Sequence, residues 1–192
     1  KIRWGILGPG IIARQFANDI RHTETGELAA VASRSGDRAR DFTSEFSIPR
    51  QYGSYDDLYR DPNVDAVYVA TPHNFHFEQS ATALRAGKAV LCEKPLTESL
   101  ERSRALLDVA RDTGMYLMEG MWTWFLPAIR KAKEWHEQGR IGAIRHIHAS
   151  FGYPLPYDPM HRGYNPDLAG GVLLDMGIYP LALTRLFIRA EP

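Results

Sequence analysis

The sequence predicts an α/β fold, a doubly wound parallel sheet followed by the beginning of an α+β domain with a mainly antiparallel sheet. Two observations predict the parallel sheet. Along residues 1–120, short apolar runs alternate with stretches whose apolar residues recur at helical spacing. The connections between them are short, as in strand–helix–strand units. The chain then becomes rich in aromatic residues, so we expect the first domain over 1–120 and a partial second domain over 121–192.

The first strand is expected at residues 2–7, an apolar run typical of a buried parallel strand. The pattern Gly8-x-Gly10-x-x-Ala13 follows it and opens a helix. Gly8 permits a tight turn, Gly10 lets a pyrophosphate approach the backbone, and Ala13 lets the helix pack closely. The helix N-terminus offers N–H groups to phosphate. The pattern predicts a dinucleotide-binding turn, against the alternative of an ordinary strand–helix turn. Its cofactor-binding residues are Gly8, Gly10, Ile11 and Ile12.

The end of the second strand, expected at residues 27–34, bears on which dinucleotide binds. In NAD-binding folds an acid near this point hydrogen-bonds the ribose 2′-hydroxyl. Here Ser33 and Arg34 end the strand, and Arg38 follows. Serine and arginine would bind a 2′-phosphate, which an acid would repel. The sequence therefore favours NADP over NAD, unless Arg34 and Arg38 are only solvated surface charges.

The rest of the first domain continues the alternation. Helices are expected at about 37–46, after Ser54, at about 71–86 and at 99–113, and strands at 51–52, 65–71, 88–93 and 115–121. In the helix 99–113 we expect apolar side chains at Leu100, Leu106, Leu107, Val109 and Ala110 to reach the core. Ligands of such sheets lie at the carboxyl ends of the strands. The cofactor-binding residues predicted there are Thr71, Pro72, His73, His76, Glu93 and Lys94.

The second domain is expected to begin with a helix at about 127–138. Residues 143–153 alternate between apolar and polar and predict a strand of an antiparallel sheet. A loop rich in proline, glycine and tyrosine follows, and an apolar helix at 170–188 carries Asp175 and Tyr179.

Composition excludes several classes of function. The formal net charge is zero, so nothing indicates a nucleic-acid surface. No apolar run reaches membrane-spanning length, and the first residues read as a strand rather than a signal peptide. The single Cys92 lies in an apolar strand, which fits a buried thiol in the cytoplasm. His146 and His148 share a strand face without a third ligand, so we expect no metal site.

Three polar residues are candidates for catalysis. Lys94 ends a strand beside the predicted crevice, and Asp175 and Tyr179 share one helix face because they are four residues apart. A tyrosine can take a hydroxyl proton if a nearby ammonium stabilises its phenolate, and Lys94 is the candidate ammonium. The spacing leaves open that Asp175 only binds a nearby backbone group and that Tyr179 is a core aromatic.

The chain resembles the glucose–fructose oxidoreductase/inositol dehydrogenase family, also called Gfo/Idh/MocA. The matching motifs are Gly8-x-Gly10-x-x-Ala13, Thr71-Pro72-x-x-x-His76, Glu93-Lys94-Pro95 and the stretch from Gly170 to Tyr179. The resemblance implies that Lys94 reaches both the nicotinamide ribose and the substrate. It implies that Asp175 contacts the substrate side.

Tyr179 stands where many members of that family carry an acid/base histidine. Tyrosine there resembles the branch of dimeric dihydrodiol dehydrogenase and NADP-dependent D-xylose dehydrogenase, which uses tyrosine as the base and favours NADP. Trp124 departs from the family, since related sequences commonly have arginine there. The family continues with further strands that usually form a dimer face, so the resemblance implies a homodimer or a higher homo-oligomer for the full-length protein.

The expected activity is that of an NADP-dependent oxidoreductase acting on CH–OH groups. Its small-molecule substrate is expected to be a sugar or a cyclic polyol or diol. One alternative is an NAD-dependent glycosidase of the same family, which Ser33 and Arg34 argue against. Another is a non-catalytic dinucleotide-sensing protein. A sensor has no need of the proton-handling set Lys94, Asp175 and Tyr179.

Overall fold

The computed structural model describes residues 1–188 of the chain. The chain divides into two compact units, Lys1–Gly120 and Met121–Pro192, and each is described by itself. Among the residues described, no helix combines the length and the apolar character needed to cross a membrane.

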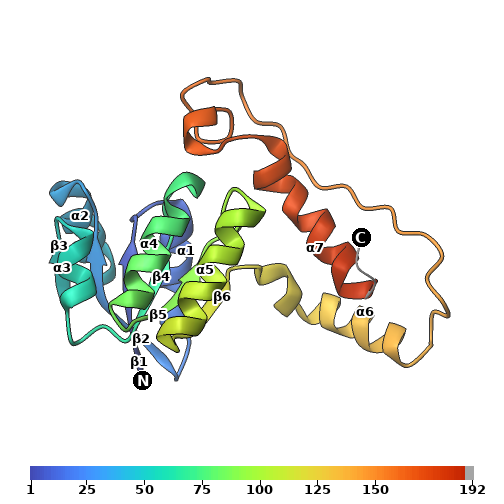
Figure 1. Cartoon of the computed structure of the whole chain (residues 1–192), viewed down its shortest axis with the longest axis horizontal. Coiled ribbons are helices and arrows are strands. Elements are labelled where there is room, and N and C mark those ends of the chain that lie inside the picture. Colours follow the sequence, from blue (N-terminus) through green and yellow to red (C-terminus); the bar gives the residue numbers. More distant parts are fainter. Residues whose placement is uncertain (189–192) are drawn as a thin grey trace. The chain divides into compact units, whose positions relative to one another are not determined.

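The first unit is built on one six-stranded sheet with the order β3-β2-β1-β4-β5-β6, in which every pair of neighbours is parallel (Figure 1). This is the order of a doubly wound dinucleotide-binding sheet, so the predicted fold class is confirmed. The strands are β1 Ile2–Leu7, β2 Gly26–Ala32, β3 Arg50–Tyr52, β4 Ala66–Val69, β5 Ala89–Cys92 and β6 Leu117–Glu119.

Helices cover both faces of this sheet, because the chain moves outward from β1 to β3, crosses back to β4 and then moves outward in the other direction to β6. Helices α1 and α2 bury apolar residues such as Ala13 and Phe42 in one cluster, while α3, α4 and α5 bury Leu58, Leu84 and Leu106 in another. The helices are α1 Ile11–Ile20, α2 Gly36–Phe46, α3 Tyr55–Arg60, α4 His76–Arg85 and α5 Leu100–Thr113, with a 3₁₀ turn η1 at His73–Phe75.

The buried face of α5 is narrower than the sequence predicts. Leu106 is fully buried, and Val109 and Ala110 pack beside it on the same stripe. Leu100 and Leu107, however, are 65% and 50% exposed, so the prediction that they reach the core is wrong. They lie seven residues apart on the neighbouring stripe of the helix, which faces away from the sheet.

Arg3 in β1 binds Asp65, which precedes β4. Its backbone N–H and its Nε each donate to Oδ2 of Asp65, at 2.8 and 3.0 Å, and Nη2 donates to Oδ1 at 2.6 Å. These hydrogen bonds hold the pKa of Asp65 at about 2, below its ordinary value of 3.8. The folded state therefore gains stability above about pH 4 and loses it as the pH falls toward 2.

We expect Arg3→Met to lower the unfolding temperature at pH 7, and we expect this deficit to shrink as the pH falls from 4 to 2. The effect is modest because both side chains are partly exposed. Thermal unfolding followed by circular dichroism across this pH range measures it. Arg40→Met, which removes a more exposed ion pair to Asp37 within α2, is the matched control. A deficit that stays constant with pH would show that Arg3 stabilises by packing alone.

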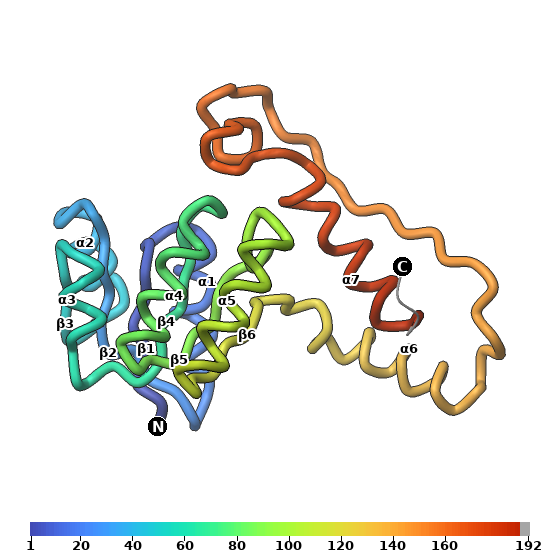
Figure 2. The backbone as a smooth tube through the Cα atoms, in the orientation of Figure 1, coloured from blue at the N-terminus to red at the C-terminus, as the bar shows by residue number. Residues whose placement is uncertain are grey.

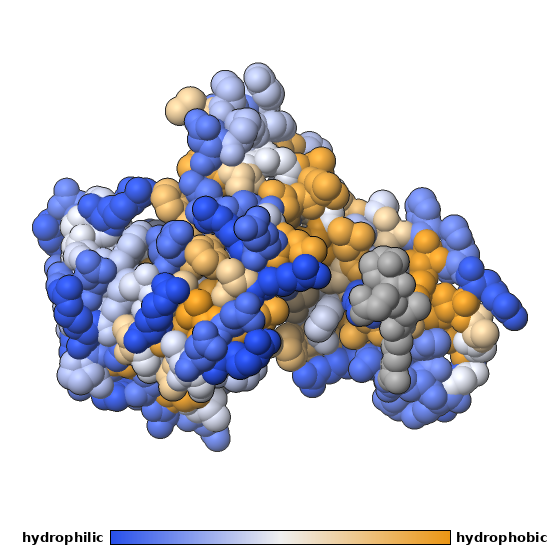
Figure 3. Space-filling view, viewed as in Figure 1, coloured by the Kyte–Doolittle hydropathy of each residue, from blue (hydrophilic) through white to orange (hydrophobic). Residues whose placement is uncertain are grey.

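All the regular elements of the second unit are helical over the residues described. Its elements are η2 Trp122–Phe125, α6 Pro127–Glu137, η3 Pro166–Leu168, the π-helix η4 Leu173–Gly177 and α7 Ile178–Phe187. Of residues 121–188, only Met121, Asp175 and Ala182 are buried. Many aromatic and aliphatic side chains therefore stay exposed, and apolar atoms gather over α7 in Figure 3.

The strand predicted at residues 143–153 is absent. This part of the second unit runs without regular structure between α6 and η3 (Figure 2). A strand needs a neighbour to satisfy its backbone N–H and C=O groups, and no described residue of the second unit forms one. Alternation of polar and apolar residues was the only signal for this strand. Such alternation predicts which residues would share a face, but not whether a second strand lies beside them.

Candidate functional site

The glycine turn after β1 has the geometry that its sequence predicts. Gly8 has φ +82°, and a Cβ atom there would lie 2.7 Å from Thr71 Cγ2 and 3.1 Å from the carbonyl oxygen of Ala70. Gly8 therefore combines a left-handed backbone with a close approach to the segment after β4. Its carbonyl accepts from the N–H of Gly10 at 2.8 Å, which tightens the turn.

The N-terminus of α1 opens directly from this turn. Gly10 is the N-cap and provides no side chain to the first N–H groups. A Cβ on Gly10 would meet nothing closer than 4.0 Å, so the space in front of the helix is open. Ile11 is 92% exposed beside it, and Ile12 is 41% exposed. An open helix N-terminus with uncapped N–H groups fits a pyrophosphate, so these residues fit a dinucleotide.

The end of β2 presents basic and hydroxyl groups. Ser33 is buried, and its Oγ accepts from the N–H of Ser35 at 3.2 Å. Ser35 caps α2 by accepting from the N–H of Arg38. The side chains of Arg34 and Arg38 are exposed at the start of α2. No acid follows the strand until Asp37, which pairs with Arg40 at 3.0 Å.

The segment after β4 is held from inside the unit. Thr71 is buried, and its hydroxyl donates to Oε1 of Gln79 at 2.6 Å. His76 is fully buried, and its two ring nitrogens lie 2.8 Å from the carbonyl oxygens of Thr71 and Pro95. Burial lowers the pKa of His76, and the two carbonyl partners oppose that shift. Both ring nitrogens therefore face backbone carbonyls, and neither is left to bind a cofactor. His76 instead positions the segments after β4 and β5 that carry Thr71 and Pro95. Pro72 is half-buried and His73 is buried, 5.6 Å from His76 between ring centroids.

The segment Glu93-Lys94-Pro95 follows β5 and is fixed by its neighbours. The hydroxyl of Tyr68 in β4 donates to Oε1 of Glu93 at 2.5 Å, and the N–H of Leu96 donates to Oε1 of Glu119 at 2.7 Å. Burial raises the pKa of Glu119. Lys94 itself is half-buried. The backbone that carries Lys94 is therefore tied to both neighbouring strands and, through His76, to the segment after β4.

Asp175 and Tyr179, the other two predicted catalytic residues, belong to the second unit. A Cβ on Gly170 would lie 2.7 Å from the carbonyl oxygens of Arg162 and Asn165, so glycine lets the chain turn tightly before the helix. Asp175 lies on the π-helix and is buried, with Oδ1 3.4 Å from Nη1 of Arg162. Arg162 is a partner that the sequence analysis missed.

Tyr179 lies at the start of α7 among aromatic side chains. Its hydroxyl oxygen accepts from Nε1 of Trp122 at 3.2 Å, and its ring packs against those of Trp122 and Phe151. A phenolate accepts such an N–H more strongly than a phenol does. Trp124, the departure noted in the sequence, donates from Nε1 to the carbonyl of Ala182 at 3.2 Å, so it joins η2 to α7 within the second unit.

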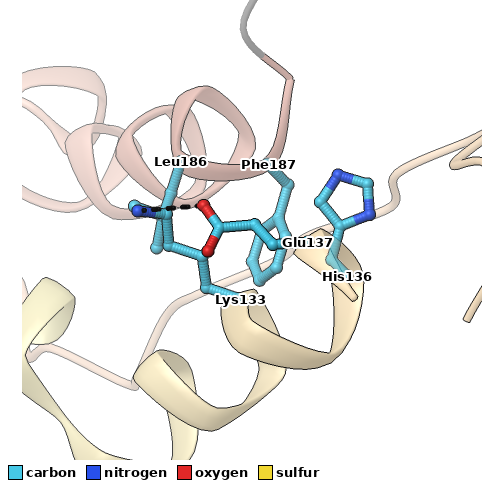
Figure 4. A pocket seen from close by; sticks show the side chains of 5 residues that line it. All are labelled: Lys133, His136, Glu137, Leu186 and Phe187. Atoms are coloured by element: carbon cyan, nitrogen blue, oxygen red, sulfur yellow. Dashed lines mark ion pairs between the residues drawn. The ribbon is translucent and has the colours of Figure 1, made fainter. Parts of the chain in front are cut away.

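A separate pocket of about 580 Å³ lies between α6 and α7 (Figure 4). Lys133 and Glu137 form an ion pair at its edge at 3.5 Å, and the ring of Phe187 lies 5.9 Å from that of His136. None of the predicted site residues lines it. Residues 1–188 contain no cluster of three or more side chains suited to hold a metal ion.

Two carboxamide and carboxylate side chains of the first unit hold the segments that end at the predicted crevice. Oε1 of Gln79 accepts from the hydroxyl of Thr71, and Oε1 of Glu119 accepts from the N–H of Leu96. The sequence analysis missed the contact of Gln79, which stands in none of the motifs.

Family models match both parts of the chain. Residues 2–121 match the oxidoreductase family with an NAD-binding Rossmann fold, and residues 129–192 match the GFO/IDH/MocA C-terminal domain. The latter model supports a second domain of this family, although the residues described there form no sheet.

Curated relatives and solved structures agree with these matches. The chain is 40% identical to trans-1,2-dihydrobenzene-1,2-diol dehydrogenase of Mus musculus, over 99% of this chain and 57% of that protein. It is 40% identical to D-xylose 1-dehydrogenase (NADP(+)) of Hypocrea jecorina, over 94% of this chain and 51% of that protein. The chain thus spans about half the length of these relatives.

A crystal structure of a 3-ketoreductase from Actinomadura kijaniata in complex with NADP and TDP-benzene is similar in fold. Its TM-score is 0.90 at 39% identity, and the match covers 97% of this chain and 57% of that one. A putative myo-inositol dehydrogenase from Sinorhizobium meliloti matches with a TM-score of 0.83 at 28% identity, over all of this chain and 56% of that one. With a family model covering the whole parallel sheet and its glycine turn, the chain belongs to the Gfo/Idh/MocA family of oxidoreductases.

Proposed function

We propose that the protein is an NADP-dependent oxidoreductase that transfers a hydride between the nicotinamide and a carbinol carbon of a sugar or a cyclic polyol or diol. The observation that carries this proposal is the open glycine turn before α1 together with a β2 end that presents Ser33 and Arg34 in place of an acid. The curated relatives act on a diol and on xylose, and one of them is named for NADP.

The cofactor residues divide into three groups by role. Gly8, Gly10, Ile11 and Ile12 receive the pyrophosphate at the start of α1, and Ser33, Arg34 and Arg38 receive the 2′-phosphate. Residues after β4 and β5 line the crevice toward the nicotinamide. In that group we assign Thr71, Pro72 and Glu93 to the wall of the crevice and Lys94 to contact with cofactor and substrate, while the buried side chains of His73 and His76 support these segments from inside the unit.

The catalytic residues handle a proton. Bound cofactor would supply the hydride chemistry, as NADP⁺ for oxidation of the substrate carbon and as NADPH for its reduction. In the direction of oxidation, the phenolate form of Tyr179 takes up the substrate's hydroxyl proton and becomes a phenol, and the Lys94 ammonium favours the phenolate before that transfer. The N–H of Trp122 stabilises the same oxygen, since it donates to the Tyr179 hydroxyl. Asp175, held by Arg162, orients the substrate hydroxyl.

Turnover with a panel of substrates tests the proposal. Nicotinamide absorbance is followed on the full-length protein with NADP⁺ or NAD⁺ and a set of aldoses, inositols and cyclic diols. We expect turnover with at least one of them and a preference for NADP⁺. Tight cofactor binding without turnover would instead indicate a dinucleotide sensor. Cleavage of glycosides with NAD retained and not consumed would indicate a glycosidase.

The full-length protein is further proposed to act in the cytoplasm as a homodimer or a higher homo-oligomer. The single cysteine, Cys92, is buried, and burial raises its pKa to about 12, which suits a structural thiol. Exposed aromatic side chains of the second unit, such as Trp135 and Phe151, offer apolar surface for association. Size-exclusion chromatography with multi-angle light scattering on the full-length protein measures the molar mass of the assembly.

A further inference from the structure

Arg34, which follows β2, is held by an aromatic ring from another crossover. Its Cζ lies 5.1 Å from the centroid of the Phe75 ring, at the end of η1. A guanidinium at this distance from a ring is attracted by the negative charge of the ring face. The pair joins the loop after β2 to the loop after β4, although the two residues are far apart in the sequence.

Tyr55 meets the same arginine from a third element. It is the first residue of α3 and is half-buried. Burial raises the pKa of Tyr55, and the charges of Arg34 and Arg38 and a hydrogen bond with Arg34 oppose that shift. The hydroxyl therefore stays protonated at neutral pH. Arg34 thus has an aromatic face and a phenol as neighbours.

The charge of Arg34 is not neutralised within the part of the chain described. No residue among 1–188 forms an ion pair with it. The nearby Asp37 pairs instead with Arg40 within α2. A guanidinium has five N–H donors, so one that is held by a ring face and a single phenol keeps donors for an anion. Fixing the Arg34 side chain before binding reduces the conformational entropy that is lost when the anion binds.

We propose that Phe75 is a positioning residue that holds Arg34 for the 2′-phosphate of the cofactor and so sets the preference for NADP over NAD. This inference rests on the proposed use of NADP. Phe75 does not touch the phosphate itself. It restricts the guanidinium, which alone would sample many rotamers in solvent.

Two adenosine fragments separate this role from other roles of Phe75. Binding of 2′,5′-ADP and of 5′-AMP to the full-length protein is measured by isothermal titration calorimetry at low ionic strength. Arg34→Ala is expected to abolish most of the preference for 2′,5′-ADP. Phe75→Leu is expected to weaken 2′,5′-ADP binding by roughly threefold, the size of an exposed cation–π contact, and to leave 5′-AMP binding unchanged. Phe75→Tyr keeps a ring and should restore the preference.

Phe77→Leu is the matched control. Its ring lies 5.3 Å from Cζ of Arg102, so it removes a similar contact from α4 without touching Arg34. We expect its ratio of affinities to equal that of the wild-type protein. Circular dichroism checks that each variant is folded.

Three outcomes would overturn the inference. Equal weakening of both ligands by Phe75→Leu would make Phe75 a platform for adenine or a structural residue. Unchanged affinities of Phe75→Leu for both 2′,5′-ADP and 5′-AMP would show that Phe75 has no role in the preference for NADP over NAD. A wild-type protein without preference for 2′,5′-ADP would overturn the use of NADP itself. Absence of turnover with every substrate, by contrast, leaves this binding test intact.

Discussion

Replacing Tyr179 by phenylalanine is expected to reduce turnover by about 10²- to 10⁴-fold, the usual contribution of a positioned acid or base. The substitution keeps the ring that packs against Trp122 and Phe151 and removes only the hydroxyl that accepts from Trp122. Binding of NADPH should therefore stay near the wild-type level. Steady-state rates and fluorescence titration of NADPH on the full-length protein measure the two effects separately.

Tyr116→Phe is the control for this experiment, because its hydroxyl lies near Sδ of Met118 on an exposed side chain. It should change neither turnover nor NADPH binding. If Tyr179→Phe retains a rate within about threefold of wild type, a proton transfer by this hydroxyl is excluded and another group must serve as the base.

Replacing Gly8 by alanine is expected to destabilise the first unit by about 1–3 kcal/mol, because a left-handed backbone and a crowded Cβ are strained together. The Cβ would press on Thr71 and on the carbonyl of Ala70. Since Thr71 is fixed by Gln79, the glycine turn itself must shift. We expect NADPH binding to weaken by about tenfold or more, because the turn that receives the pyrophosphate is displaced.

Gly87→Ala separates the effect of backbone strain from the effect of the crowded Cβ atom. Gly87 also has a positive φ, +75°, but a Cβ there would have no neighbour within 4 Å. It should cost about 1 kcal/mol through backbone strain and leave NADPH binding intact. Urea unfolding and NADPH titration of both variants give the comparison. Equal effects of the two substitutions on binding would contradict a special role for the turn at Gly8.

The first unit could be predicted from the sequence because its signals are local. Strand β1, the glycine turn and α1 follow one another within twenty residues, and each has its own composition. The capping residues Ser54 and Ser99 mark the starts of α3 and α5. Parallel strands then bring the loops after β1, β2, β4 and β5 to one edge, so residues far apart in sequence can be assigned to one crevice.

Contacts between elements could not be predicted in the same way. The alternation at 143–153 resembles a strand, but a strand forms only beside a partner. The burial of Leu106 and the exposure of Leu107 depend on how α5 is rotated on the sheet, which adjacent leucines do not reveal. The contact of Arg34 with Phe75 depends on two loops that only the folded sheet brings together.

The buried ring of His76 faces two carbonyl oxygens, one after β4 and one after β5. Because burial lowers its pKa, the imidazole is neutral at pH 7 and carries a single N–H. It can therefore donate to Thr71 or to Pro95, but not to both at once. The tautomer of His76 therefore decides which of the two loops the ring holds by a hydrogen bond.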